Sequence, residues 1–427
     1  MISAEVNDRM TRVGPGTPAG NLLRRYWMPV AGSSELPGAG TKKVRLLSED
    51  LVLFKDQSGQ LGLIAERCPH RGCSLLLGIP ETDSLRCPYH GWLFDKDGAC
   101  LEQPPEPRDS RFKDRIVTTT YQVREMGGLV WAYLGPDPAP VLPPFDLFVQ
   151  PNVVRTIGRT LLPCNWLQIM ENALDPVHFE YLHGLFGDYM FALRGEQPLV
   201  NAVKHHLKIG FDEFEFGIIK RRVVEGTTEE DEAWRVGHPM VFPNILRVGQ
   251  GPWSQFQIRV PVDDEHTQIL WYSVIEGVDP DEPEQASVPV YPVPYLDEEG
   301  NFLAHTLEGQ DMMVWVSQGP IADRTIENVT TSDKGVLMMR RVLLREIEAV
   351  EQGRDPMGLI RDEAKYRRID LPQERHMFFK NADSAELHIL RQPGIRHSPI
   401  VSRIVDVYVR EEARLNEMQG VPEGNPV

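Results

Sequence analysis

The chain has 427 residues, 41% of them hydrophobic, and its 62 acidic and 45 basic residues give a formal net charge of −17. This acid excess argues against a nucleic-acid partner, and no apolar run approaches the roughly 18 residues that can span a bilayer. The chain begins with polar and acidic residues, unlike a secretory signal, so we expect a cytoplasmic protein, and its length favours two domains.

The first third of the chain is predicted to form a small antiparallel β domain. Short runs of β-branched and aromatic residues at 44–47, 51–54 and 129–134 are typical of strands. A stiff, proline-rich segment then covers 135–144, and such segments commonly join domains. We therefore predict two domains, 1–145 and 146–427.

Two short loops of the first domain carry candidate metal ligands. They read Cys68-Pro-His70 and Cys87-Pro-Tyr-His90, so each loop supplies one thiolate and one imidazole. Two thiolates on one iron and two imidazoles on the other describe a Rieske [2Fe–2S] cluster. The alternative is a structural zinc site, since zinc also accepts two Cys and two His, although zinc fingers usually keep the two residue types on separate knuckles.

The second domain is predicted to combine helices with further strands. Helical apolar spacing is found at 165–182 and 334–352, and strand-like stretches occur at 207–224 and 256–275. The second of these helices should be capped by the Thr-Ser pair at 331–332 and end at the glycine at 353. The acidic, proline-rich stretch at 277–300 is expected to be an exposed loop.

Electrons are expected to come from another protein. The glycines between 14 and 20 superficially resemble a dinucleotide-binding fingerprint, but two prolines interrupt them and no strand precedes them. Such a site requires a βαβ context, so the sequence shows no flavin or nicotinamide module of its own.

A second constellation follows the proline-rich segment. Asp175, His178 and His183 form the pattern Asp-x-x-His-x4-His, and two imidazoles with a carboxylate are what a mononuclear non-haem Fe(II) site requires. On an ideal α-helix the two histidines would lie about 140° apart. Both can bind one ion only if the helix is distorted or ends between them, and Gly184 is placed to end it. For the histidine pair alone, two unrelated histidines remain the alternative.

The residue after Asp175 is a proline, which disfavours helical geometry at Asp175. We therefore expect Asp175 to cap the segment that carries His178. The remaining thiols, Cys73, Cys100 and Cys164, are expected to be free in a reducing compartment. The other eight histidines lack ligand spacing and are expected to be structural or exposed.

Taken together, the two motifs resemble those of Rieske non-haem iron oxygenases, in particular the phthalate dioxygenase and O-demethylase group. The segments 11–27 and 318–324 are also similar to that group, and the resemblance covers essentially the whole chain. Respiratory Rieske proteins join their loops by a disulfide, whereas here Cys73 stands at the first of those places and Tyr89 at the second. The resemblance implies an α+β fold, with an N-terminal Rieske antiparallel β domain and a C-terminal catalytic domain whose curved antiparallel sheet packs on helices.

The resemblance also implies roles for individual residues. His178 and His183 would bind a mononuclear Fe(II). Asp175 would bridge a ligand histidine and a cluster histidine of the neighbouring subunit, which implies a homotrimer or a dimer of trimers. Asn172 either faces the iron without binding it or is an ordinary surface residue.

The third iron ligand should be an aspartate well downstream. Asp311 precedes the 318–324 motif, where the family places this ligand, and we favour it over Asp323 and Asp333 because the site demands one carboxylate.

The implied activity is O₂ activation to hydroxylate an aromatic compound, with electrons relayed through the cluster from a separate flavin or iron–sulfur reductase. Ring dihydroxylation of an aromatic carboxylate and oxidative O-demethylation of a methoxylated aromatic acid both fit. A Rieske electron-transfer protein without oxygenase chemistry is the alternative. An anionic substrate calls for an arginine, and the candidates are Arg194, Arg221, Arg235 and Arg247. We favour Arg247, with a structural salt bridge as the alternative for each of the four.

Overall fold

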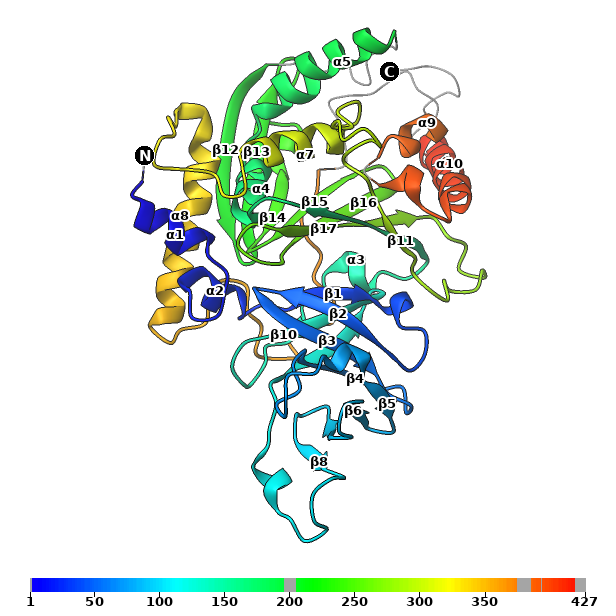
Figure 1. The fold of residues 1–427 in the computed structure, drawn as a ribbon. Helices are drawn as coiled ribbons and strands as arrows, with labels where there is room; N and C mark the ends of the chain where they lie inside the picture. Colours follow the sequence, from blue (N-terminus) through cyan, green and yellow to red (C-terminus); the bar gives the residue numbers. More distant parts are fainter. Residues whose placement is uncertain (1, 196–204, 375–384, 393, 419–427) are drawn as a thin grey trace.

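The computed structural model describes residues 2–195, 205–374, 385–392 and 394–418. The described strands form a six-stranded, a four-stranded and an eight-stranded sheet, and most helices lie around the largest of these (Figure 1). The predicted α+β architecture is thereby confirmed, whereas the division at 145/146 stays a prediction. Among the described helices, none is long and apolar enough to cross a membrane.

The six-stranded sheet is antiparallel, in the order β1-β10-β9-β4-β3-β2. Its strands are β1 (Met28–Gly32), β2 (Gly40–Leu46), β3 (Glu49–Lys55), β4 (Leu61–Ala65), β9 (Thr120–Met126) and β10 (Leu129–Tyr133). The three strands predicted in this region are β2, β3 and β10. Every residue of β10 is buried, which explains its uninterrupted apolar sequence.

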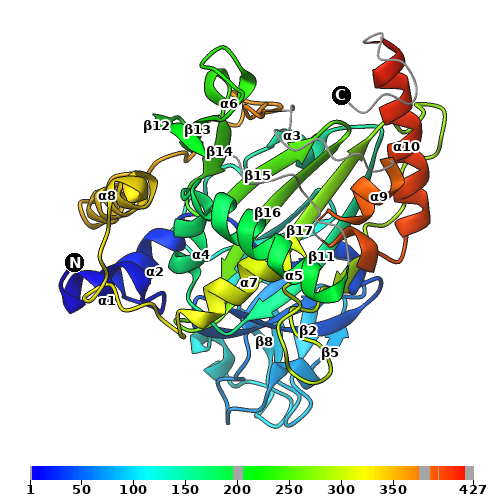
Figure 2. The ribbon, with the colours of Figure 1, turned by 90° about the horizontal axis from the view of Figure 1, so that it is seen from above.

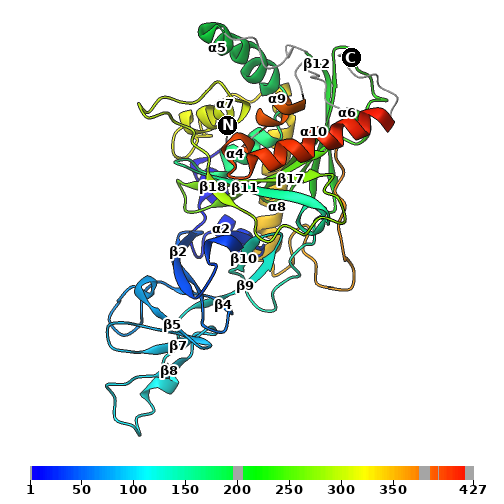
Figure 3. The same ribbon diagram turned by 90° about the vertical axis from the view of Figure 1, so that its right-hand side faces the viewer.

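The four-stranded sheet holds the loops with the predicted cluster ligands. Its strands are β5 (Ile79–Glu81), β6 (Ser84–Arg86), β7 (Leu93–Asp95) and β8 (Cys100–Glu102), paired antiparallel in that order. One ligand loop joins β4 to β5 and the other joins β6 to β7. Figures 1 and 3 show this sheet at the opposite end of the molecule from α5.

The eight-stranded sheet has the order β12-β13-β14-β15-β16-β17-β11-β18. Its strands are β11 (Val153–Leu162), β12 (His206–Phe214), β13 (Gly217–Val224), β14 (His238–Val241), β15 (Ile245–Gln250), β16 (Trp253–Pro261), β17 (Thr267–Glu276) and β18 (Val290–Pro292). Only the pairing of β18 with β11 is parallel. The segment predicted as an exposed loop at 277–300 thus contains one short strand of the sheet.

Helices cover the eight-stranded sheet, and Figure 2 shows α4, α5 and α7 above one of its faces. The helices are α1 (Ala4–Thr11), α2 (Pro18–Leu23), α3 (Asp146–Val149), α4 (Trp166–Ala173), α5 (Gly187–Arg194), α6 (Glu232–Arg235), α7 (Leu307–Ser317), α8 (Lys334–Glu351), α9 (Ala385–Leu390) and α10 (Val401–Met418). The N-terminal helices α1 and α2 lie against α8. The predicted helix at 334–352 is α8. A 3-10 turn over Thr331–Asp333, closed by hydrogen bonds between Thr330 and Asp333, leads into it, and the N-cap residue Asp333 makes no side-chain capping bond to α8.

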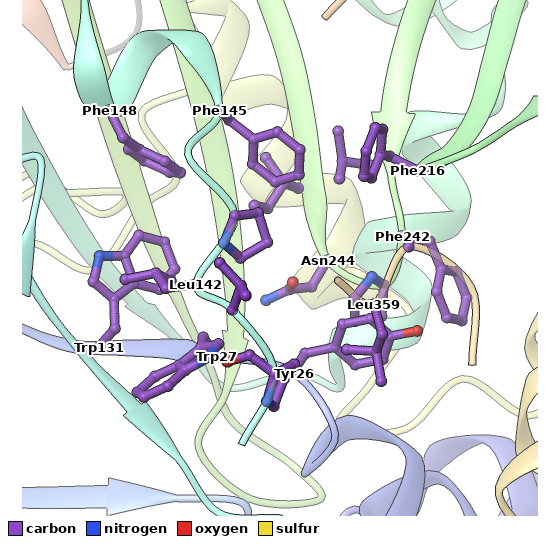
Figure 4. Close-up of a pocket in the computed structure, with 17 residues that line it drawn as sticks. Tyr26, Trp27, Trp131, Leu142, Phe145, Phe148, Phe216, Phe242, Asn244 and Leu359 are labelled. Carbon is purple, nitrogen blue, oxygen red and sulfur yellow. Dashed lines mark hydrogen bonds between the residues drawn. The ribbon is translucent and has the colours of Figure 1, made fainter. Parts of the chain in front are cut away.

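One hydrophobic core runs through both the six-stranded and the eight-stranded sheets. It encloses an apolar cavity of about 40 Å³ between Trp27 and Trp131 on one side and Phe216 and Asn244 on the other (Figure 4). None of the residues that line this cavity is a predicted metal ligand, so the candidate functional site lies elsewhere.

Candidate metal centres

The two cluster loops have the same backbone geometry. The N–H groups of Cys68 and Cys87 each donate to the carbonyl five residues further on, over 2.9 and 2.8 Å. Gly72 and Gly91, at φ +71° and +74°, provide the left-handed turn within each loop, a conformation that glycine adopts without steric cost. The repeated Cys, Pro and Gly of the sequence therefore encode two equivalent, tightly closed turns.

The side chains of these loops separate into an inner and an outer pair. Cys68 and Cys87 are each 2% exposed, whereas His70 and His90 lie on the outside with ring centroids 4.5 Å apart. A single tetrahedral zinc would hold its ligand atoms roughly 3.5 Å apart. In the described part of the chain, these loops do not bring even three such atoms within 4.8 Å of one another. The arrangement fits two irons, one held by the thiolates and one by the imidazoles.

The backbone that carries His178 and His183 is distorted in the way that the sequence requires. The helix predicted at 165–182 ends with α4 at Ala173, and a π-helix follows from Phe179 to Phe186. Its i→i+5 hydrogen bonds bring residues five apart toward one face, and the two imidazole centroids lie 5.2 Å apart. The expectation that Gly184 ends the helix is wrong, because the helix continues into α5.

Both imidazoles are oriented by hydrogen bonds on Nδ1. His178 Nδ1 lies 2.5 Å from the backbone carbonyl of Asp175, and His183 Nδ1 lies 2.9 Å from Oε1 of Gln310. Donation from Nδ1 leaves Nε2 as the ligand atom, a common device at metal sites. As predicted, Asp175 also caps the segment, since its Oδ1 accepts from the N–H groups of Val177 and His178 at 2.9 and 3.4 Å.

Asp311 of α7 completes the group. Its Oδ1 lies 3.3 Å from Nε2 of His183 and 3.7 Å from Nε2 of His178, and the three ligand atoms lie within 4.8 Å of one another. This oxygen is buried, yet it makes no hydrogen bond with the described residues. A buried carboxylate oxygen without a partner is costly, and two imidazoles with one carboxylate suit Fe(II), so the donor set fits the expected metal.

The electrostatics of the group agree with its geometry. Burial lowers the pKa of His178 to about 3, which keeps this imidazole neutral, as a ligand must be. Burial opposes protonation of His183 as well, but the charge of Asp311 and a hydrogen bond raise the pKa of His183. His183 in turn lowers the pKa of Asp311 against the effect of burial. Each of these two residues thus favours the charged form of the other, and a bound cation would take over that stabilisation.

The two alternative candidates for the third iron ligand, Asp323 and Asp333, make hydrogen bonds to nearby threonines instead. Asp323 bonds the N–H and hydroxyl of Thr325 at the surface, and Asp333 bonds Thr330 at the start of α8. The side chain of Asn172 makes no hydrogen bond with the described residues, while its carbonyl accepts from the N–H of Asp175 at 3.1 Å.

Known proteins are similar to this chain in both its N-terminal and its C-terminal part. Residues 26–122 match the model of the Rieske [2Fe-2S] domain, and residues 296–386 match the model described as LigXa C-terminal domain like. The chain is 45% identical to the 5,5'-dehydrodivanillate O-demethylase oxygenase subunit of a Sphingobium species, over 87% of each chain. It is 32% identical to the phthalate 4,5-dioxygenase oxygenase subunit of Pseudomonas putida, over 84% of this chain and 89% of that one.

This chain belongs to the Rieske oxygenases. It is an oxygenase component and contains the Rieske domain that holds a [2Fe–2S] cluster. The relatives are named as oxygenase subunits, and the alternative of a pure electron carrier has no support among them.

Solved structures share the fold of this oxygenase. That of NdmA from Pseudomonas putida CBB5 has a TM-score of 0.58 at 24% identity, over 78% of this chain and 94% of that one. An oxygenase in complex with ferredoxin, from carbazole 1,9a-dioxygenase, has a TM-score of 0.56 at 21% identity, over 80% of this chain and 95% of that one.

The arginine that we favoured for substrate binding is occupied elsewhere in the oxygenase. Arg247 is 3% exposed, and its guanidinium pairs with Asp146 at 2.6 Å and donates to Gln373 at 2.6 Å. This is the structural salt bridge that the sequence left open. Arg221 similarly pairs with Asp212.

Arg259 on β16 is a further candidate for substrate binding that the sequence pattern does not single out. It is 1% exposed, donates to Oε1 of Gln257 at 2.9 Å and lies against Met170 of α4. No carboxylate of the described residues lies within ion-pair distance, and its Nε has no hydrogen-bond partner. Its charge nevertheless contributes to lowering the pKa of Asp311, which places an incompletely paired buried cation near the candidate iron site.

Several of the other histidines are structural, as expected. His205 and His206 both contact the carboxylate of Glu180, at 2.9 and 2.6 Å, and so tie the π-helix to the start of β12. Of the other predicted structural histidines, His376 lies outside the described residues.

Proposed function

We propose that this oxygenase removes a methyl group from a methoxylated aromatic acid, at a mononuclear Fe(II) held by His178, His183 and Asp311. The observation that carries the proposal is the proximity of this triad to Arg259, a buried cation without a carboxylate partner. Arg259 takes the role that the sequence had given to Arg247.

The charge of Arg259 supports an acidic substrate. Burial lowers the pKa of Arg259 to about 10, which measures the cost of burying a guanidinium without a full counter-ion. A substrate carboxylate would supply that counter-ion and form paired hydrogen bonds with the guanidinium. Such a contact fixes one end of the aromatic ring and thereby determines which substituent faces the triad.

Demethylation is favoured over ring dihydroxylation by the relatives. The O-demethylase subunit is 45% identical, against 32% for the phthalate dioxygenase subunit. In a balanced reaction, the methoxyarene, O₂, two electrons and two protons give the phenol, formaldehyde and water. The bound iron would supply the site of O₂ activation. The chain contributes the orientation of the two imidazoles, the anchoring of the acid and the exclusion of water by α4 and α7.

The electron path supports a trimer or a dimer of trimers. Within one chain, the cluster loops lie at the opposite end of the molecule from α7 (Figures 1 and 3). We infer that the cluster of a neighbouring subunit delivers the electron through Asp175, whose carboxylate is 28% exposed and lies 3.8 Å from His178 Nδ1. The cluster would be recharged by a reductase with flavin and iron–sulfur groups.

A single-turnover experiment tests the activity without knowledge of the reductase. The oxygenase is purified anaerobically, its iron is counted, and it is reduced with dithionite, which is then removed. A 3-methoxybenzoate derivative and O₂ are added, and formaldehyde, phenol and cis-diol are quantified. The matched control is the methoxyarene without the acid group.

The proposal expects about three irons per chain and one formaldehyde per demethylated acid, with little product from the control. A cis-diol as the main product would replace demethylation by dihydroxylation. Equal turnover of the acid and of the neutral control would rule out an anionic substrate.

A further inference from the structure

Lys220 on β13 is a second buried cation on the helix-covered face of the sheet. The residue is 6% exposed, and its ammonium donates to the backbone carbonyl of Ala173 over 3.0 Å. Among the described residues, this carbonyl is its hydrogen-bond partner, and no carboxylate lies within ion-pair distance. Burial of an ammonium is costly, so its retention here calls for an explanation.

The carbonyl that accepts the hydrogen bond from Lys220 lies at the C-terminal end of α4, just before the segment that carries His178. Ala173 is the last residue of α4, and the carbonyls at the end of a helix have no partner within the helix. A lysine ammonium satisfies such a carbonyl and interacts favourably with the negative end of the helix dipole. Two residues later, the carbonyl of Asp175 holds Nδ1 of His178.

We propose that Lys220 is a positioning residue for the iron ligand His178. By fixing the carbonyl that ends α4, the ammonium sets the turn from Ala173 to Asp175. The Asp175 carbonyl then orients the imidazole of His178 toward Asp311. The inference rests on the proposed iron site and adds to it a residue that touches neither the metal nor the substrate.

The surroundings of Lys220 explain why a lysine is suited to this place. Burial and the neighbouring Arg222 lower the pKa of Lys220 to about 8, whereas the carboxylates of Asp175, Glu374 and Asp311 favour its charged form. Glu374 is buried, and Asp175 and Asp311 are half-buried, so a nearby cation offsets part of the repulsion among these acids. A neutral side chain of similar length would fill the same space but would leave the Ala173 carbonyl and these acids without that cation.

The test compares Lys220→Met with Lys220→Arg and with Lys208→Met. Methionine keeps the length but loses the donor, whereas arginine keeps both charge and donor. Lys208 lies on the neighbouring strand β12, is about half exposed and pairs with Glu229 at the surface, so its variant controls for loss of a lysine. The measurement is the iron affinity of the mononuclear site by chelator competition. The EPR spectrum of the ferrous site with nitric oxide reports its ligand geometry independently of turnover.

We expect Lys220→Met to bind the third iron about 10- to 100-fold more weakly, the range seen when a partner of a metal ligand is removed. Its nitric oxide spectrum should change as well. Lys220→Arg should recover most of the affinity, and Lys208→Met should equal the wild type. The visible spectrum of the cluster should be the same in all variants. If Lys220→Met does not yield folded protein, Lys220→Gln, which keeps an N–H donor but not the charge, is tested with the same measurements.

The outcomes separate this inference from the proposed function. A wild type that binds only the two cluster irons would overturn both. A wild type with three irons, together with a folded Lys220 variant whose affinity and nitric oxide spectrum are unchanged, would overturn the positioning role alone. Equal losses in Lys220→Arg and Lys220→Met would also contradict it.

Discussion

His178 is the N-cap residue of a π-helix that contains His183 five residues later, and their imidazole rings are 5.2 Å apart at an interplanar angle of 72°. An α-helix would turn the same two side chains about 140° away from each other. The wider turn is therefore the local feature that allows one helix to present both ligands to one ion. π-helical segments are rare and occur frequently at functional sites.

Replacing Asp311 should empty the mononuclear site and leave the cluster intact. Asp311→Ala removes the only carboxylate of the triad, so we expect iron to fall from about three to about two per chain, with an unchanged cluster EPR signal. Asp323→Ala, at the surface, is the control and should keep three irons. Unchanged iron in Asp311→Ala would exclude this residue as a ligand.

The orientation of His183 by Gln310 should matter for metal affinity. Gln310→Leu removes the acceptor of the His183 Nδ1–H bond, so the imidazole can rotate or change tautomer. We expect iron to bind about 10- to 100-fold more weakly, as measured by chelator competition. Gln318→Leu, just after the same helix and exposed, should have no effect, and equal losses in both variants would contradict the argument.

Replacing the two buried arginines should have different effects, one on substrate binding and the other on the stability of the fold. Arg259→Met should raise KM for a carboxylate substrate by about 10- to 100-fold, the equivalent of a charged hydrogen bond of about 1.5–3 kcal/mol, with little change for a neutral methoxyarene. Arg247→Met should instead lower the melting temperature, because it leaves Asp146 buried without its partner. KM and the melting temperature are measured for both variants. A KM effect confined to Arg247→Met would identify Arg247, and not Arg259, as the residue that binds the substrate carboxylate.

A buried network should make stability depend on pH. Arg324 and Arg340 both pair with Glu171, and despite burial they lower the pKa of Glu171 below its ordinary value of 4.5. A carboxylate with a lowered folded-state pKa stabilises the fold above pH 4.5, and this contribution is lost as the pH falls below 4.5. Glu171→Gln should cost about 3–5 kcal/mol at pH 7.

Denaturant titrations of wild type and Glu171→Gln between pH 7 and pH 4 measure this effect. The difference between the two proteins should be constant down to about pH 4.5 and shrink below it. A difference that grows on acidification would contradict the assignment of the network.

The sequence predicted which residues the structure brings together at the candidate iron site, His178, His183 and Asp311, but its favoured arginine, Arg247, forms a structural salt bridge. Metal ligands are short patterns in the chain, and the Cys68–His70 and Asp175–His183 segments carry their geometry within a few residues. The sequence showed that the helix must be distorted if His178 and His183 bind one ion. It did not show that the distortion would be a π-helix. The choice of a π-helix over a chain break depends on tertiary contacts such as that of Glu180 with His206.

The sequence pattern of β16 did not indicate that Arg259, the proposed substrate-binding residue, is buried. Its polar residues at 255, 257 and 259 alternate with apolar residues, a pattern typical of a strand with one face in water. In the structure, all nine residues of β16 are buried, and the polar face lies beneath α4. Arg259 could therefore be identified only once the helices were placed above the sheet. Arg247, by contrast, lies on the same sheet but meets Asp146 of α3.

The hydrophobic core shared by the six-stranded and eight-stranded sheets has a consequence for electron delivery. Because the two units are packed as one body, we expect them to unfold in a single cooperative step and the cluster to stay at a fixed distance from the rest of its own chain. In the proposed trimer, electron tunnelling to a neighbouring subunit would then depend on how firmly the subunits associate, and no movement of the cluster unit relative to its own chain would be needed. Dilution that separates the subunits should accordingly stop turnover while leaving both metal centres spectroscopically intact.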